Sequence, residues 1–329
     1  MSSSRAFVSR FLHFWRTQFG ASGAGRRLRL GIGVSGGRDS CVLAALIGRM
    51  KAHLGVRRVV LLHLDHGIRP VAERRRDRAV LRALSRRVRA PLVVDRVRLR
   101  ATGEGLEAAG RSARLKFFSR AARRYRLDAI AQAHHLDDRI ETFFLFLLRG
   151  SGLRGLTSLR STETLAAGGG SLNIIRPLLP FTRDEILEFS AAEKISYHED
   201  STNRDLRFLR NRLRLELIPM LKSWHPGFAK AMAATQQALE SEDAALSDLA
   251  DGLYRGRLDP AELRNWPEAV VARVLQRWGR RRGGSAVLGG HKNLAAAARL
   301  IRSAARASLD LPGGRKLLID RSRIRLAGG

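Results

Sequence analysis

Eight residues between an alternating apolar run and a helical pattern, "GVSGGRDS" at 33–40, have the composition of a phosphate-binding loop. Glycines let main-chain N–H groups approach a phosphate, and the helix that follows adds the positive end of its dipole. Serine hydroxyls are further donors. A Gly-rich turn between a strand and a helix explains the glycines alone equally well. The residues expected to bind phosphate are Ser35, Gly36, Gly37, Arg38, Asp39 and Ser40.

Asp39 separates this loop from the G-x-x-x-x-G-K-[ST] pattern, because an acid stands where that pattern has its lysine. A carboxylate beside a polyphosphate is repulsive unless a cation lies between them. We therefore predict that Asp39 binds Mg²⁺ carried by a nucleotide.

A second group of polar residues stands at the start of a predicted helix, in "AHHLDDRIETFF". His134, Asp138 and Glu141 are spaced to share one helical face, and they are poor material for a core. We expect them in a site. Asp137 is expected to be the N-terminal cap of the same helix.

Cations are dense in a third segment, "YHEDSTNRDLRFLRNRLRLELIP". This density is enough to meet a phosphate and unusual for a plain surface: the arginines concerned are Arg207, Arg210, Arg212 and Arg214. A further helical stretch places Glu107, Arg111 and Arg114 on one face. In an Arg-rich chain, a solvent-exposed helix face with salt bridges is enough to explain these three residues.

The elements that must position these residues alternate through the first half of the chain. Apolar runs predict strands, and amphipathic patterns predict the helices between them. This repeated βαβ order predicts an α/β fold with a doubly wound, mostly parallel sheet, whose ligands lie beyond the carboxyl ends of the strands. The predicted strands are 28–34, 59–64, 92–97 and 128–133, and the predicted helices are 39–53, 71–88, 106–125 and 137–149.

The second half has a different character. A Gly/Ser-rich stretch at 161–173 is expected to be a loop, and Thr182 is expected to cap the next helix. From residue 216 the pattern is Ala- and Arg-rich and helical, with one helix expected from the Asp259 cap through Trp278. Residues 307–326 alternate around a Pro-Gly-Gly turn and predict a short hairpin or meander. We therefore expect two domains, a nucleotide-binding domain at 1–215 and a smaller, mostly helical domain at 216–329.

Composition limits the classes of function. The chain of 329 residues has 61 Lys and Arg against 30 Asp and Glu, a net charge of +31, which favours a polyanionic partner such as RNA. A biased genome would also produce scattered arginines, so the charge needs support from a site. Cys41 is the only cysteine, which excludes an intramolecular disulfide framework and a Cys-ligated metal site and favours a reducing cytoplasm. No apolar run is long enough to predict a membrane span.

Together these segments resemble the tRNA(Ile)-lysidine synthases, members of the ATP pyrophosphatase (PP-loop) group whose signature is an S-G-G-x-D-S loop. The resemblance runs in order from about residue 28 to 226. The loop alone marks only the wider group, whereas "HHLDDRIETFFLFLLRGSGLRGL" and "EDSTNRDLRFLRNRLR" are more specific. Further blocks are "LDHGIRP", "LEAAGRSARLKFF" and "RPLL" followed by "TRDEI". Gly110 stands where the family usually has Ala, and the length suggests a short form with one auxiliary domain.

The resemblance implies an ATP- and Mg²⁺-dependent ligation of free L-lysine to position 2 of the wobble cytidine in the CAU anticodon of tRNA(Ile). The base attacks the α-phosphate of ATP, pyrophosphate leaves, and the lysine ε-amine then displaces AMP, which changes decoding from AUG to AUA. A homodimer is also suggested by the family.

By the same resemblance, the residues have separate roles. The loop 35–40 holds pyrophosphate, Arg114 and Arg212 offset charge on the α-phosphate, and His134 contacts ATP or the activated base. Asp138 and Glu141 bind the cationic lysine. The RNA is assigned to Arg207, Arg210 and Arg214, with the second domain gripping the tRNA arm.

Two alternatives remain open at this point. A tRNA thiolase of the same ATP-using group would generally need catalytic or cluster-binding cysteines, for which Cys41 is a poor substitute. A basic RNA-binding protein with a degenerate nucleotide fold is the other, and the intact Ser35, Asp39 and Asp138 argue against it.

Overall fold

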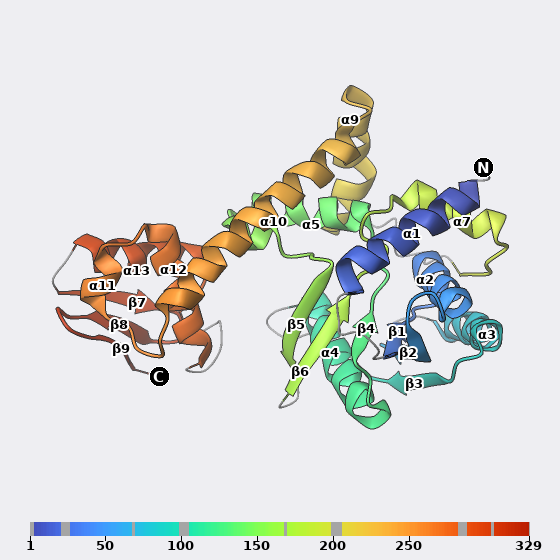
Figure 1. Cartoon of the computed structure of the whole chain (residues 1–329), viewed down its shortest axis with the longest axis horizontal. Coiled ribbons are helices and arrows are strands. Elements are labelled where there is room, and N and C mark those ends of the chain that lie inside the picture. Colours follow the sequence, from blue (N-terminus) through green and yellow to red (C-terminus); the bar gives the residue numbers. More distant parts are fainter. Residues whose placement is uncertain are drawn as a thin grey trace. The chain divides into compact units, whose positions relative to one another are not determined.

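The chain forms two compact units (Figure 1). The structure is a computed structural model, and it describes residues 3–20, 27–67, 70–98, 105–167, 170–198, 206–281, 288–303 and 306–328. The first unit is Met1–Leu145 with Leu159–Ala233, and the second is Phe146–Ser158 with Ala234–Gly329. This division differs from the boundary expected after residue 215, because the helices up to residue 233 pack in the first unit and a short internal segment packs in the second.

A six-stranded sheet in the order β3-β2-β1-β4-β6-β5 is the centre of the first unit (Figure 1). All neighbouring strands are parallel except β5, which is antiparallel to β6. The predicted doubly wound, mostly parallel sheet is therefore confirmed. The chain order reverses between β1 and β4, which makes this point of the sheet the expected ligand crevice. The strands are β1 (Leu28–Gly33), β2 (Val56–Asp65), β3 (Leu92–Arg96), β4 (Ala129–Ala131), β5 (Thr162–Ala167) and β6 (Gly170–Ile175).

Helices cover both faces of this sheet, and strand β2 shows why. Its alternate residues Val59 and Leu61 join one apolar cluster, while Val60 and Leu62 join another on the opposite face. The first cluster includes residues of α1 (Ser3–Phe19), α2 (Arg38–Met50), α3 (Val71–Val88) and α7 (Arg183–Ala192); the second is completed by α4 (Gly105–Tyr125). With α5 (Leu136–Leu148), all four helices predicted for the first half are present.

The predicted loop at 161–173 is wrong, because this stretch forms the hairpin β5–β6. Leu172 and Ile174 are buried on one side of β6, and Ile174 pairs with the parallel strand β4. Small residues obscured this alternation in the sequence, and the neighbouring strand supplies the partner that a Gly/Ser-rich segment needs. Residues 168 and 169 lie outside the described part of the chain.

Two further features position the site. Thr182 caps α7 as predicted, since it accepts a hydrogen bond from the Glu185 backbone N–H in a reciprocal capping box. One continuous helical run then carries the arginine-rich segment: α8 (Leu209–Arg212), a π-helical turn η2 (Leu213–Leu217) and α9 (Ile218–Trp224).

The second unit is helical apart from a small meander, as predicted. Asp259 caps its helix, but the single helix expected through Trp278 is wrong: Pro267 interrupts it, because proline lacks an N–H and restricts the residue before it. Trp278 belongs to the apolar core of this unit. The elements are α6 (Leu153–Leu156), α10 (Phe228–Leu253, which begins in the first unit), α11 (Pro260–Arg264), α12 (Glu268–Arg281), α13 (His291–Ser303), β7 (Ala307–Leu311), β8 (Arg315–Ile319) and β9 (Ile324–Ala327).

Candidate active site

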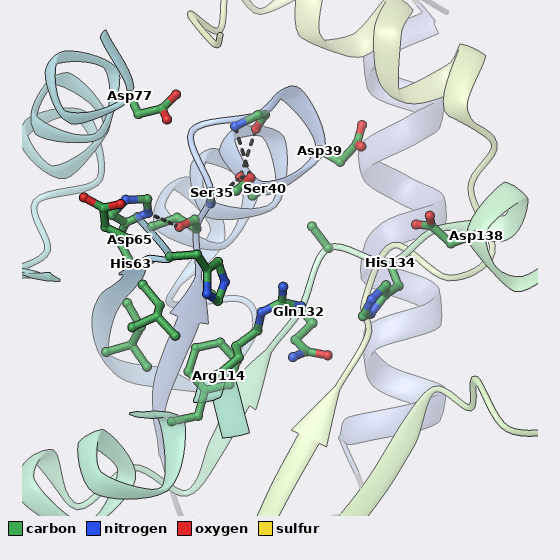
Figure 2. Close-up of a pocket in the computed structure, with 18 of the residues that line it drawn as sticks. Ser35, Asp39, Ser40, His63, Asp65, Asp77, Arg114, Gln132, His134 and Asp138 are labelled. Carbon is green, nitrogen blue, oxygen red and sulfur yellow. Dashed lines mark hydrogen bonds between the residues drawn. The ribbon is translucent and has the colours of Figure 1, made fainter. Parts of the chain in front are cut away.

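A cavity of about 630 Å³ opens in the first unit beyond the carboxyl ends of β1, β2 and β4 (Figure 2). This is the crevice expected from the reversal of strand order. The cavity brings together residues that lie far apart in the sequence. The predicted site residues on its wall are Ser35, Gly37, Asp39, Ser40, Arg114, His134, Asp138, Arg210 and Arg214.

The phosphate loop, residues 35–40, is held by its own serines. Ser40 Oγ accepts from the Ser35 backbone N–H at 3.1 Å and donates to the Gly37 carbonyl at 2.9 Å. Ser35 Oγ accepts from the Gly37 backbone N–H at 3.2 Å. Gly36 has φ +92°, a conformation that favours glycine, and helix α2 begins directly after Gly37. The loop is therefore a preformed turn at a helix N-terminus.

A buried Asp77–His198 pair supports this loop and was missed in the sequence. The backbone N–H of His198 donates to the Gly36 carbonyl at 2.9 Å, and its Nδ1 lies 3.1 Å from Asp77 Oδ1. Asp77 is only 3% exposed, on the inner face of α3. An acid at a core position of an Arg-rich helix was the available signal.

His135 links the phosphate loop to the start of α5. Its Nε2 lies 3.7 Å from Asp39 Oδ2 and 3.4 Å from Asp138 Oδ2. Burial lowers the pKa of His135, but the carboxylates of Asp138, Asp137 and Asp39 outweigh burial and raise it. Figure 2 shows Asp39 and Asp138 on the same side of the cavity. The sequence pattern predicts a role for His134, whereas the role of His135 becomes visible only in the folded chain.

Asp138, Glu141, Arg210 and Arg214 form what we call the acid–arginine cluster. Glu141 is 1% exposed and accepts from Arg210 Nε at 2.7 Å and from Arg214 Nε at 2.6 Å. Asp138 Oδ1 accepts from Arg210 Nη2 at 3.0 Å. Burial raises the pKa of Asp138, but the neighbouring histidines and Arg210 lower it further than burial raises it. Two arginines predicted to bind RNA thus neutralise the two predicted lysine-binding acids in this structure.

Arg212 is not brought to the cavity wall. It lies two residues from Arg210 and two from Arg214, so the helix turns it to the opposite side, where its Nε is 3.4 Å from Glu216 Oε2. Arg207 is exposed ahead of α8. Arg38 pairs with Asp39 at 3.1 Å, and its side chain does not line the cavity. The expected grouping of Arg212 with Arg114 is therefore not observed.

His134 is held by Arg176, a residue of the "RPLL" block to which the sequence analysis gave no role. Arg176 Nε donates to His134 Nδ1 at 3.3 Å, and its other nitrogens bond Glu163 Oε2 and the Arg160 carbonyl. Burial is the largest effect on His134, and together with nearby arginines it lowers the pKa of the ring to about 3, although Asp138 raises it. The imidazole is therefore neutral at physiological pH.

Asp137 does not cap α5, contrary to the prediction. It lies inside the helix and accepts from the Arg183 backbone N–H at 2.7 Å and from Lys222 Nζ at 2.8 Å, joining α5 to α7 and α9. These contacts outweigh burial and lower its pKa. The capping contact comes from Asp138, whose Oδ2 accepts from the His135 backbone N–H at 3.1 Å.

The opposite side of the cavity carries His63 and Asp65 (Figure 2). His63 Nδ1 bonds the Val34 carbonyl, and Asp65 accepts from the Gly67 backbone N–H, so both have structural partners. Within the described ranges, no three His, Cys, Asp or Glu residues are placed to hold a metal ion. Asp39, with its carboxylate on the cavity wall, fits Mg²⁺ carried by polyphosphate, since protein-bound Mg²⁺ often takes only one or two carboxylates. The side chain of Glu107 lies outside the described part.

Cys41 packs in the core under the phosphate loop. Burial raises the pKa of its thiol to about 12, so a thiolate does not form there at neutral pH. In the part of the chain that the structure describes, no helix has the length and apolarity needed to cross a membrane.

Comparison with known proteins identifies relatives of this chain. The model of the PP-loop domain, an ATP-binding family, matches residues 9–221 and supports ATP as the nucleotide. The tRNA(Ile)-lysidine synthase of Geobacter sulfurreducens is 35% identical over 232 residues, which are 69% of this chain and 47% of that protein. The tRNA(Ile)-lysidine synthase of Gloeobacter violaceus is 33% identical over 253 residues, which are 75% of each chain. The chain spans about half the length of several curated relatives that it matches.

The fold also has solved neighbours. A U34-tRNA thiolase from Methanococcus maripaludis with a [4Fe-4S] cluster superposes with a TM-score of 0.59 over 72% of this chain and 80% of that chain. Sequence identity is 17%, so this likeness concerns the fold alone.

Proposed function

The chain belongs to the tRNA(Ile)-lysidine synthase family of PP-loop proteins, and we propose from that premise that it ligates L-lysine to position 2 of the wobble cytidine in the CAU anticodon of tRNA(Ile). The observation that carries the proposal is the shared cavity. Its wall carries a loop suited to pyrophosphate, with Asp39, and the carboxylate of Asp138, which is suited to an ammonium group. Glu141 lies buried behind the wall in the acid–arginine cluster.

In the first step, the O2 atom of the cytosine forms a bond to the α-phosphorus of ATP, and the bond to the leaving pyrophosphate breaks. Residues 35–40 bind the pyrophosphate, and Arg114 on the cavity wall stabilises the charge that develops on the α-phosphate. Asp39 would hold Mg²⁺, which supplies positive charge to the polyphosphate when bound. Arg114 takes this role without Arg212, which lies outside the wall.

In the second step, the ε-amine of lysine forms a bond to C2 of the base, and the C2–O bond to AMP breaks. A free ε-amine has a pKa of about 10.4 and arrives protonated, so it needs carboxylates to bind it and must release a proton before attack. Asp138 and Glu141 provide the carboxylates. The lowered pKa of Asp138 suits it to pairing with the ammonium group. The proton that the amine releases before attack would be taken by one of the two carboxylates.

Those carboxylates are paired with Arg210 and Arg214 before lysine arrives. The lysine ammonium therefore has to replace a guanidinium group. RNA phosphates offer the displaced arginines new partners, since Arg binds phosphate in a bidentate manner. The pairing of these arginines with the acids and their predicted binding of RNA would then follow one another in time.

The net charge of +31 fits a tRNA partner held through its backbone, with unpaired anticodon bases read in the cavity. The second unit would grip the tRNA arm. A homodimer and a cytoplasmic location, where the single cysteine stays reduced, belong to the same proposal.

Incubation with radiolabelled lysine, ATP and total tRNA tests the proposal. Label should appear in the CAU-anticodon tRNA and require ATP. Asp39→Asn should reduce this activity, because it removes the carboxylate expected to hold Mg²⁺. Asp95→Asn is its matched control, since Asp95 is an exposed acid of β3 that pairs with Arg120. ATP-dependent sulfur transfer without lysine incorporation would instead indicate a thiolase, and RNA binding with no pyrophosphate release would indicate a non-catalytic binding protein.

A further inference from the structure

The hairpin β5–β6 ends at Arg176, whose side chain is 4% exposed. Three different nitrogens of its guanidinium group are used. Nη2 donates to Glu163 Oε2 at 2.7 Å, Nη1 to the Arg160 carbonyl at 2.8 Å, and Nε to His134 Nδ1 at 3.3 Å. A planar guanidinium fixed at two points has little freedom to turn, so the direction of its Nε–H is fixed as well.

This contact determines where the imidazole proton lies. Arginine has only donors, so His134 Nδ1 must accept, and a neutral imidazole then carries its single proton on Nε2. A proton on Nδ1 would face the N–H of Arg176 and lose the hydrogen bond. Since His134 lines the cavity (Figure 2), this ring presents a donor with neither nitrogen available as a base.

We propose that Arg176 is a positioning residue that locks His134 in its Nε2–H tautomer, so that His134 acts as a fixed hydrogen-bond donor to a phosphate oxygen of the bound nucleotide and not as an acid or base. The role at the nucleotide rests on the proposed function; the tautomer itself does not. The acceptor is assigned to phosphate because the same cavity wall carries the phosphate loop.

The surroundings of His134 agree with this assignment. Charged groups face the ring from each element packed against it: Asp138 of α5, Arg210 of α8, Arg114 of α4 and Arg176 after β6. Asp138 alone favours a protonated ring, whereas burial and the three arginines disfavour it, which lowers the pKa of His134 to about 3. Arg176 is the group of this set with a hydrogen bond to the ring nitrogen.

Neutrality has a consequence for the neighbouring acid. A protonated His134 would pair with Asp138 and compete with any cation that Asp138 must bind. By bonding to Nδ1, Arg176 adds to the effect of burial, which keeps the ring neutral and leaves Asp138 to its partners in the acid–arginine cluster. Through His134, Arg176 thus affects both the nucleotide phosphate and the acid–arginine cluster.

The test measures the tautomer directly, in protein labelled with ¹⁵N-histidine, by long-range ¹H–¹⁵N spectra without RNA. In the wild type, Nδ1 of His134 should appear as an acceptor-type nitrogen and Nε2 as a protonated one, unchanged from about pH 5 to about pH 8. His134→Gln assigns the signals among the nine histidines of the chain. Arg29→Gln is the matched control, because Arg29 is another arginine of the first unit that is paired with an acid, Asp128, and it is not among the groups that act on His134.

Arg176→Met removes both the donor and the charge. We expect a mixture of the two tautomers, with at least about a fifth of the ring in the other form, and a ring that titrates within this pH range. Arg176→Gln, whose amide still donates, should keep more of the original tautomer than Arg176→Met. If Arg176→Met does not fold, Arg176→Lys and Glu163→Gln replace it. Each keeps a cation at position 176 and loosens its hydrogen bond to His134 Nδ1, so each should also increase the share of the other tautomer.

Kinetics separate positioning from packing. In Arg176→Met, kcat for pyrophosphate release should fall about tenfold with KM for ATP within about threefold of wild type, and the rate should acquire an acid-side ionisation that the wild type lacks. A wild-type ring that titrates near pH 6.5, or an Arg176→Met ring indistinguishable from wild type, would overturn the inference. If the tautomer is locked but no lysine is incorporated by the wild type, the proposed function fails and the lock stands.

Discussion

The phosphate loop and the acid–arginine cluster face the same cavity, but they are held together in different ways. Within the loop, hydroxyl and main-chain hydrogen bonds join residues at most five positions apart, and a single backbone bond from His198 to the Gly36 carbonyl supports it from a distant segment. The cluster is closed by ion pairs between residues about seventy positions apart, with Glu141 almost completely buried. One is a local turn, and the other exists only when α5 and the helical run 209–224 meet.

This difference separates two physical requirements. A pyrophosphate group needs several donors aimed at one place, which a glycine-rich turn at a helix N-terminus supplies without long-range contacts. An ammonium site needs buried negative charge, which is costly unless cations balance it until the ligand arrives. The acid–arginine cluster carries its own counter-cations, so binding an ammonium group exchanges one cation for another. The phosphate loop binds pyrophosphate without such an exchange.

The largest effects are expected when one acid in each of the two regions is replaced separately. Asp39→Asn should reduce pyrophosphate release roughly a hundredfold to a thousandfold, because it removes the carboxylate expected to hold the metal. Asp138→Asn should leave this first step within a few fold of wild type and lose transfer of lysine. Both steps are measured separately, as pyrophosphate released and as labelled lysine incorporated. Equal losses of both steps in both variants would show that the two regions are one functional unit.

Removing one acid of the cluster should affect folding next most strongly. Glu141→Gln leaves Arg210 and Arg214 without their principal counter-charge in a buried position, and we expect a loss of about 3 kcal/mol in the free energy of unfolding of the first unit. Urea denaturation measures it. Glu216→Gln is the control, because the exposed pair of Glu216 with Arg212 should contribute less than about 1 kcal/mol. Equal losses in the two variants would contradict the role given to burial.

The same comparison explains how far sequence reasoning reached. The loop and the helix capped by Thr182 could be predicted because each depends on residues within one or two turns of chain. The parallel sheet could be predicted because the repeated βαβ order limits how its strands connect. Pairing across the fold could not. His135 and Arg176 were missed because their importance comes from Asp39 and His134, which only the folded chain brings to them.

The incorrect predictions have specific physical causes. The hairpin β5–β6 was taken as a loop, since its glycines and serines have low strand propensity and its stability comes from pairing with β4. The family resemblance pairs Arg212 with Arg114, and this role stays a prediction, although the helix turns Arg212 away from the cavity wall and toward Glu216. Pro267 was visible in the sequence and was not given its weight as a helix breaker.

The smallest expected effect is on the pH dependence of the free energy of unfolding. Here the two regions should differ in the shape of the stability profile and not in the size of the loss. The lowered pKa of Asp138 gives stability that is complete above its unfolded value of about 3.9 and is lost as the pH falls below about 4. The raised pKa of His135 gives stability that is complete below about pH 6.5 and is lost as the pH rises through its folded value. Both limbs should be visible in urea denaturation of the wild type as a function of pH.

Because Asp138 contributes to the shift of His135 as well as its own, Asp138→Asn should flatten both limbs of this profile. Ser40→Ala in the phosphate loop should lower the whole curve by about 1 kcal/mol and leave its shape unchanged, since a serine hydroxyl does not titrate in this range. A Ser40→Ala profile with a changed shape would mean that the loop and the cluster share their charges, and that the separation between a local turn and a long-range ion cluster does not hold.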